Sequence, residues 1–119
     1  MTRPAILIVE DDAMTSVLLR VLFEKQGFEV TLIQDGQTAL DHLNEKPACR
    51  AVLLDILLPH VNGLHLLKHA RSLPQWADAK IMVLSAKDQE PDIRLAQSLG
   101  ANGYLTKPFD PNELLALIG

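Results

Sequence analysis

The chain has 119 residues, of which 48% are hydrophobic and 22% charged, and these proportions are typical of a single globular domain. The net charge of −4 argues against direct nucleic-acid binding, because neutralising phosphates requires a basic surface. Cys49 is the only cysteine, which excludes an internal disulfide and favours a reducing, cytoplasmic setting. No apolar run approaches the roughly 20 residues of a membrane span, so we expect no membrane contact.

Short apolar runs and helical repeats alternate five times along the sequence. A continuous apolar run of four or five residues is typical of a strand that is buried on both faces of a sheet. A more alternating pattern predicts a strand with one exposed face, which suits the edge of a sheet. The strands are predicted at 5–9, 28–33 (the alternating one), 51–54, 81–84 and around 104–105.

The first helix is predicted between Asp12, a suitable N-cap, and Gly27, a suitable residue just beyond the C-terminal end. Its apolar residues recur at helical spacing, and we take them as the face that packs on the sheet. Met14 is therefore assigned to the core, as is Met82 in a later strand. The repeat consists of Met14, Val17, Leu18, Val21 and Leu22.

Four further helices are expected, each following a strand. Proline at the first helical position and glycine after the last one mark such boundaries. Strands that alternate with helices predict an α/β fold, in which right-handed crossovers cover both faces of a parallel sheet. We expect residues 1–119 to form one domain whose last helix is cut short. The helices are predicted after Asp35–Gly36, after Asn62–Gly63, from Pro91 to Leu99, and from Pro111 onward.

Polar side chains stand where the predicted strands end. In an open α/β sheet, ligands bind beyond the carboxyl ends of the strands, where the strand order reverses. If the first and third strands are neighbours, three carboxylates, a hydroxyl and an ammonium converge there. A simpler alternative is that Asp55 merely ends its strand and keeps the turn soluble. The residues are Glu10, Asp11, Asp55, Ser85 and Lys107.

Crowded carboxylates resist ionisation unless a positive group joins them. A hard divalent cation provides that charge, and Mg²⁺ binds through one or two carboxylates while it keeps several waters. A hydroxyl and a lysine beside the ion suit a phosphoryl group, whose oxygens need neutralising during transfer. Asp55 is then the candidate nucleophile, and its attack gives an aspartyl phosphate.

With these features the whole chain resembles the receiver domain of bacterial response regulators. Each motif alone is weak, but their order on successive strand ends is specific. The matching residues are Glu10 and Asp11 as the acidic pair, Asp55 as the phosphoacceptor, Pro59 and Gly63 as the following turn, Ser85 as the switch hydroxyl, Tyr104 as the rotating aromatic, and Lys107–Pro108 as the lysine and cis proline.

The resemblance implies a flavodoxin-like (βα)5 fold, a doubly wound parallel sheet with strand order 2-1-3-4-5. It also implies transfer of a phosphoryl group to Asp55 from a sensor histidine kinase or a histidine phosphotransfer protein. Mg²⁺ would be required, with Mn²⁺ as a substitute. Asp11, Asp55 and the backbone carbonyl of Leu57 would hold the metal, and Glu10 would act through water.

The resemblance further implies a switch. Ser85 and Lys107 would bind the phosphoryl oxygens, and Tyr104 would turn as Ser85 moves. The surface of the fourth helix, last strand and last helix would then change and control a C-terminal output domain or a downstream protein. Such a domain is not an enzyme with a separate substrate, because it catalyses only its own phosphorylation and dephosphorylation.

Four positions have specific consequences. Asn102 and Gly103 stand where the family often has two acids, so we expect a monomer rather than a salt-bridged dimer. Leu57 and Lys87 lie two residues after the phosphoacceptor and the switch hydroxyl, where the family tunes hydrolysis. Leu57 would cover the approach of water, and Lys87 would pair with a phosphoryl oxygen, so the phosphate should be long-lived.

Two other functions remain as alternatives. An aspartyl-phosphate hydrolase usually has a second aspartate two residues after the nucleophile, where this chain has Leu57. A degenerate receiver that only binds proteins would not need the complete set of polar residues. His65 and His69 stand four residues apart but lack a third metal ligand, and we expect a solvated helix face. Trp76 is expected to be a packing residue.

Overall fold

The computed structural model describes residues 3–46, 49–59, 61–87 and 89–118. Five parallel strands form one sheet in the order β2-β1-β3-β4-β5, which confirms the expected α/β fold and strand order. The alternating strand β2 lies at an edge, as its sequence predicts. The strands are β1 (Ala5–Val9), β2 (Glu29–Ile33), β3 (Ala51–Leu54), β4 (Lys80–Ser85) and β5 (Gly103–Thr106).

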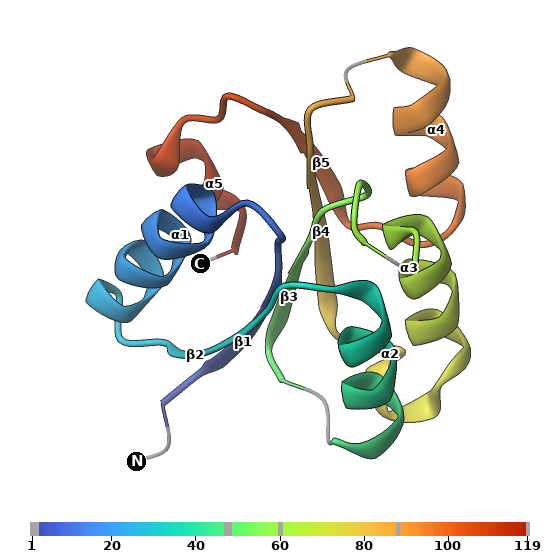
Figure 1. Ribbon diagram of the computed structural model, residues 1–119, viewed down its shortest axis with the longest axis horizontal. Helices are drawn as coiled ribbons and strands as arrows, with labels where there is room; N and C mark the ends of the chain where they lie inside the picture. The colour runs from blue at the N-terminus through green and yellow to red at the C-terminus, as the bar shows by residue number, and fades with distance from the viewer. Residues whose placement is uncertain (1–2, 47–48, 60, 88, 119) are drawn as a thin grey trace.

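Helices cover both faces of the sheet. Figure 1 shows α1 and α5 on one side and α2, α3 and α4 on the other. Within the described residues, no helix combines the length and the apolar character needed to cross a membrane. The helices are α1 (Ala13–Lys25), α2 (Gly36–Glu45), α3 (Gly63–Ser72), the short 3₁₀ helix η1 (Pro74–Trp76), α4 (Glu90–Ser98) and α5 (Pro111–Ile118).

Local signals in the sequence set the helix boundaries. Asp12 caps α1 by accepting the N–H of Thr15, as predicted. Gly27 and Gly100 follow α1 and α4 with φ of +88° and +107°, a conformation that favours glycine. Pro91 is the second residue of α4 rather than the first, because Glu90 begins the helix after the N-cap Gln89.

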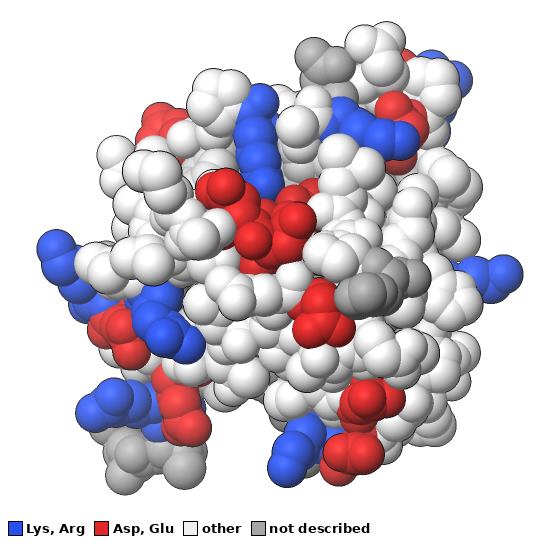
Figure 2. All heavy atoms as spheres, in the orientation of Figure 1, with Lys and Arg blue, Asp and Glu red and all other residues white. Residues whose placement is uncertain are grey.

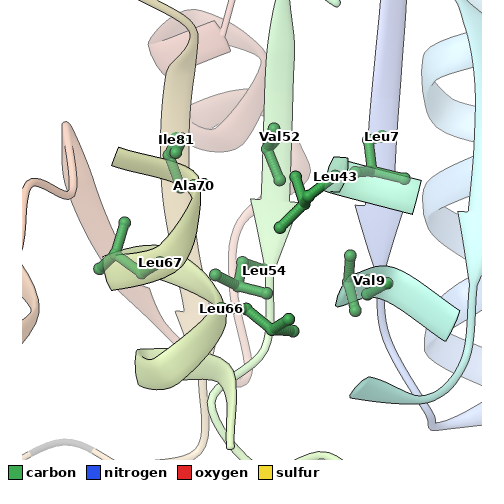
Figure 3. Close-up of a pocket in the computed structure, with 10 residues that line it drawn as sticks. Leu7, Val9, Leu43, Val52, Leu54, Leu66, Leu67, Ala70 and Ile81 are labelled. Atoms are coloured by element: carbon green, nitrogen blue, oxygen red, sulfur yellow. The ribbon is translucent and has the colours of Figure 1, made fainter. Parts of the chain in front are cut away.

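The larger core lies between the sheet and the helices α2, α3 and α4. Trp76 is fully buried in this core and donates its indole N–H to the carbonyl of Leu43 at 3.0 Å, so its predicted packing role is confirmed. This core contains a cavity of about 10 Å³. Figure 3 shows side chains that line it, among them Leu7, Val52 and Leu66. So small an apolar cavity leaves the sheet well supported beneath the strand ends.

The buried face of α1 differs from the prediction. Met14 is 84% exposed, and the rest of its repeat up to Val21 is largely exposed as well, so the assignment of Met14 to the core is wrong. The helix instead packs on the sheet through Ser16, Leu19 and Phe23. Apolar residues occur on both sides of this helix, so helical spacing alone did not identify the side facing the sheet. Met82, by contrast, is buried as predicted.

The turn after β3 is tightly packed. A Cβ atom at Gly63 would overlap the carbonyl oxygen of Asp55, so only glycine lets α3 begin there. Gly63 donates its N–H to Ile56 at 2.8 Å, and Gly36 at the start of α2 donates to Pro59 at 3.1 Å. These contacts hold the segment that follows Asp55 against α2 and α3.

Candidate functional site

The predicted site residues meet at the carboxyl edge of the sheet. Because β1 and β3 are neighbours with Val9 opposite Leu54, the residues that follow them, Glu10 and Asp55, end at the same level. Ser85 is the last residue of β4, and Lys107 follows β5. Figure 2 shows acidic side chains gathered near the centre of one face of the molecule, with a basic side chain next to them.

Most of these polar groups are buried. Glu10 is 1% exposed and Asp55 5%, and Ser85 is fully buried, whereas Asp11 is exposed. A buried carboxylate is costly unless it is paired or hydrogen-bonded. The simpler alternative, in which Asp55 ends its strand and faces water, is therefore wrong.

Lys107 supplies the positive charge. Its Nζ lies 2.6 Å from Glu10 Oε1 and 3.1 Å from Asp55 Oδ2. Burial lowers the pKa of Lys107, but the hydrogen bonds and charges of Glu10 and Asp55 outweigh it and raise this pKa above its ordinary value. The ammonium is therefore charged at neutral pH and holds both carboxylates. The peptide bond from Lys107 to Pro108 is cis, as the resemblance implies.

Lys107 does not fully offset the cost of burying the Glu10 carboxylate. Burial raises the pKa of Glu10, with a smaller contribution from the charge of Asp55, while hydrogen bonds from Lys107 and the N–H of Asp12 lower it. The Asp12 N–H donates to Glu10 Oε2 at 3.1 Å. The net effect is a raised pKa, so ionising Glu10 costs more free energy in the folded domain than in the unfolded chain.

The residues fit a divalent cation. Carboxylate oxygens of Glu10, Asp11 and Asp55 lie within 4.8 Å of one another, and they form the only such group of metal-ligating side chains among the described residues. Three carboxylates face one ammonium, which leaves a negative excess that a hard cation with oxygen ligands would neutralise. His65 and His69 form no such group, and His69 bonds instead to Asn44 at 2.7 Å.

Ser85, Lys87 and Tyr104 are connected by hydrogen bonds. The Ser85 hydroxyl accepts the N–H of Lys87 at 3.2 Å, and the Tyr104 hydroxyl donates to the carbonyl of Lys87 at 2.8 Å. The N–H of Lys107 donates to the carbonyl of Ser85 at 2.8 Å. The loop after β4 therefore joins the buried hydroxyl to the half-buried aromatic ring of β5.

Of the two positions expected to tune hydrolysis, Leu57 contacts Asp55 and Lys87 pairs with a residue of α4. Leu57 donates its N–H to Asp55 Oδ1 at 3.0 Å, and its side chain is 48% exposed. The ammonium of Lys87 lies 3.9 Å from Asp92 on α4, an exposed and weak pair. Their effect on phosphate lifetime stays a prediction.

Two features near the site were not predicted from the sequence. Ser16 on α1 is buried and donates its hydroxyl to the carbonyl of Glu10 at 3.0 Å. Its spacing to Leu19 and Phe23, which places all three on one face of the helix, could have indicated that Ser16 is buried. The second feature is the exposed apolar face of α1, where Leu18 lines a hollow together with Lys107 and the two residues after it.

Comparison with known proteins identifies this class of domain. Residues 6–119 match the response regulator receiver domain family. The transcriptional regulatory protein CpxR of Escherichia coli K12 is 40% identical over 95% of this chain and 47% of its own length. The aerobic respiration control protein ArcA of the same strain is 41% identical over 96% of this chain and 46% of its own length. The chain thus spans about half the length of these curated relatives.

A solved receiver-domain structure has the same fold as this chain. The receiver domain of sensor histidine kinase PA1611 from Pseudomonas aeruginosa PAO1 has a TM-score of 0.88 and 27% identity, covering 98% of this chain and 95% of its own. That structure holds a magnesium ion in its active site cleft. The fold and the acidic site therefore define a CheY-like receiver, and the chain belongs to the response regulator receiver domain family. It is a receiver domain of two-component signal transduction. Domains of this family partner with histidine kinases or phosphotransfer proteins.

Proposed function

We propose that Asp55 is the phosphoacceptor of this domain. The main support is the position of Asp55, which is 5% exposed and lies beside Glu10 and Asp11. Its Oδ2 is 3.1 Å from the charged Nζ of Lys107. A carboxylate oxygen of Asp55 attacks phosphorus, and the bond from phosphorus to the donor's imidazole nitrogen breaks. The electron pair of that bond stays on the imidazole, which leaves as the neutral ring because its other nitrogen carries a proton taken from water.

Mg²⁺, or Mn²⁺ in its place, would neutralise oxygens of the phosphoryl group during transfer. Asp11, Asp55 and the backbone carbonyl of Leu57 would hold the ion, and Glu10 would contact it through water. The negative excess of the acidic cluster supports this assignment. Glu10 and Asp55 are already oriented by Lys107, so little rearrangement is needed on binding.

Lys107 and Ser85 bind the phosphoryl oxygens. Lys107 exchanges part of its contact with Asp55 for a contact with the new group, whose charge is greater. Ser85 moves its hydroxyl toward the phosphoryl group and releases the N–H of Lys87. Because the carbonyl of Lys87 holds Tyr104, this movement reaches the surface formed by α4, β5 and α5. Tyr104→Phe tests the link: it should leave phosphorylation intact but speed amide exchange at residue 87, and unchanged exchange would contradict it.

The donor is a protein that carries phosphohistidine, either a sensor histidine kinase or a phosphotransfer protein. The exposed apolar face of α1, defined by Met14, Val17, Leu18 and Val21, supports a protein donor. It is continuous with the site, because Leu18 and Lys107 line the same hollow. A protein that reaches Asp55 would therefore cover this face and remove it from water.

The domain acts in the cytoplasm as a signalling switch that catalyses only its own phosphorylation and dephosphorylation. The relatives CpxR and ArcA are about twice as long as the matched region, which supports control of a C-terminal output domain. A separate downstream protein would serve the same role.

Incubation of the purified domain with Mg²⁺ and acetyl phosphate tests the assignment. We expect a lasting mass increase of one phosphate that Asp55→Asn abolishes. Rapid release of inorganic phosphate would favour a hydrolase, and no modification would favour a degenerate receiver. Equal labelling of Asp55→Asn would disprove the site. Leu18→Ser should slow transfer from a protein donor and leave the acetyl phosphate rate unchanged.

A further inference from the structure

Within the part of the chain that the structure describes, Ser16 is the one buried polar side chain without a role in the proposed phosphorylation. Among the described residues, the buried polar or charged side chains are Glu10, Ser16, Asp55 and Ser85. Ser16 is 1% exposed and stands on the inward face of α1 with Leu19 and Phe23. Alanine would fill this position without burying a hydroxyl, which is costly unless it is hydrogen-bonded. The serine hydroxyl therefore needs a specific partner.

That partner lies outside the helix. Ser16 donates its hydroxyl to the carbonyl of Glu10 at 3.0 Å, six residues earlier in the chain. A serine within a helix ordinarily bonds to a carbonyl three or four residues back. The carbonyl four residues back, that of Asp12, accepts the backbone N–H of Ser16 at 2.9 Å, as in any helix. The hydroxyl thus reaches past the first turn of α1 to the loop that leaves β1.

The carbonyl that Ser16 holds belongs to the peptide unit between Glu10 and Asp11. The paired part of β1 ends at Val9, and the N–H of Glu10 donates to Ile33 at 2.9 Å. Because a peptide unit is planar, fixing its oxygen also fixes the direction in which the chain continues to Asp11. Asp11 is exposed, so packing does little to orient it.

We propose that Ser16 is a positioning residue for the divalent cation: its hydroxyl holds the peptide unit between Glu10 and Asp11, so that both carboxylates stay directed at the ion. This inference rests on the metal site of the proposed function. It can be tested apart from the phosphoacceptor assignment, because Mg²⁺ binding is measurable without a phosphoryl donor. The Ser16 hydroxyl bonds to the carbonyl of Glu10, so it would act on the ion only through the backbone.

The test compares Ser16→Ala with Ser16→Thr, which keeps the hydroxyl. Mg²⁺ is titrated into each ¹⁵N-labelled domain without a phosphoryl donor, and the amide shifts give the dissociation constant. We expect Ser16→Ala to raise the dissociation constant about 3- to 10-fold, the size expected from one hydrogen bond. Ser16→Thr should stay within about twofold of the parent chain. In metal-free protein, amide exchange at residues 11 and 12 should be faster in Ser16→Ala alone.

Two control variants separate positioning from stability. Val30→Ala, in the edge strand, lowers stability far from the site, and Ser98→Ala removes an exposed hydroxyl that bonds within α4. Both should bind Mg²⁺ like the parent chain. With acetyl phosphate, Ser16→Ala should raise the Mg²⁺ concentration for half-maximal rate but keep the maximal rate within about twofold.

An unchanged dissociation constant in Ser16→Ala would overturn the inference, as would equal weakening in Val30→Ala. Failure of Ser16→Thr to restore binding, with its fold intact, would also overturn it. If the parent chain binds Mg²⁺ but is not phosphorylated, the proposed phosphoacceptor function fails. The comparison of Mg²⁺ dissociation constants still decides the role of Ser16 in that case.

Discussion

Replacing Asp11 by asparagine should change the stability of the domain in opposite directions with and without Mg²⁺. Asp11 is the exposed member of the acidic cluster, and its carboxylate lies within 4.8 Å of carboxylate oxygens of Glu10 and Asp55. Asparagine keeps its shape but removes its charge. Lys107 pairs with the other two carboxylates, so no ion pair of the described chain is lost.

The magnitude follows from the geometry. Two unit charges 4.8 Å apart repel by about 0.9 kcal/mol in a water-like medium, which suits an exposed side chain. Two such pairs give about 1.7 kcal/mol, which attraction to Lys107 partly offsets, so we expect a gain of about 1 kcal/mol without metal. In a domain of this size that corresponds to roughly 4 °C in Tm.

Mg²⁺ should reverse the order. At a concentration one hundred times its dissociation constant, an ion that binds only the folded state stabilises the parent chain by about 2.7 kcal/mol. Asp11→Asn should lose nearly all of this increment and then be the less stable chain by about 1.7 kcal/mol.

Urea unfolding with and without Mg²⁺, followed by the fluorescence of buried Trp76, measures both free energies of unfolding. Glu24→Gln, an exposed acid further along α1, is the control and should change neither value. If Asp11→Asn lowers stability without metal, the carboxylates of the cluster do not repel as argued. If it keeps the full Mg²⁺ increment, Asp11 is not a ligand.

Three further results are expected. Burial raises the pKa of Glu10 above 4.5, so the folded state takes up its proton first. The contribution of Glu10 to metal-free stability should therefore increase as pH falls from neutral toward 4.5, and a curve that Glu10→Gln leaves unaltered would contradict this. Leu57→Asn should speed loss of the phosphate several-fold, about 1 kcal/mol in barrier, because an amide can hold the attacking water; unchanged or slower loss would refute it. The phosphorylated domain should sediment near monomer mass at micromolar concentration, since Asn102 lacks a charge for a dimer salt bridge; a tight dimer would show otherwise.

The site was predictable because its residues obey a rule of topology. Each of Glu10, Asp55, Ser85 and Lys107 stands at the end of a strand, and parallel strands end at one edge. The apolar runs identified those strands. The predicted N-cap Asp12 and the turn residues Asp35–Gly36 and Asn62–Gly63 identified the helices that follow, and the structure shows Asp35 and Asn62 to be N-caps as well. No knowledge of side-chain packing was needed for this much.

Features that depend on packing were not predictable. The inward face of α1 is set by the sheet against which it packs, so an exposed apolar repeat was mistaken for the buried one. Asn102 was interpreted through the acids it replaces, yet its side-chain oxygen accepts hydrogen bonds from Arg71 at 2.7 Å and from the N–H of Ile81. Arg71 lies 31 residues away in sequence, and its donors also hold carbonyls around η1. Contacts over such distances leave no local pattern.

The instability expected of the metal-free site and its expected affinity for a cation have one cause. Lys107 is a single charge shared by Glu10 and Asp55, and it is itself partly buried, so it cannot neutralise Asp11 as well. A second cation in the cluster would stabilise the resting fold but would also occupy the place of the metal. Lys87 on the loop after β4 pairs instead with Asp92 on α4. The acidic cluster thus keeps a negative excess that Mg²⁺ would neutralise, and under the proposed function a phosphoryl group on Asp55 would restore that excess. A site balanced at rest would bind the ion weakly and would have little to change on phosphorylation.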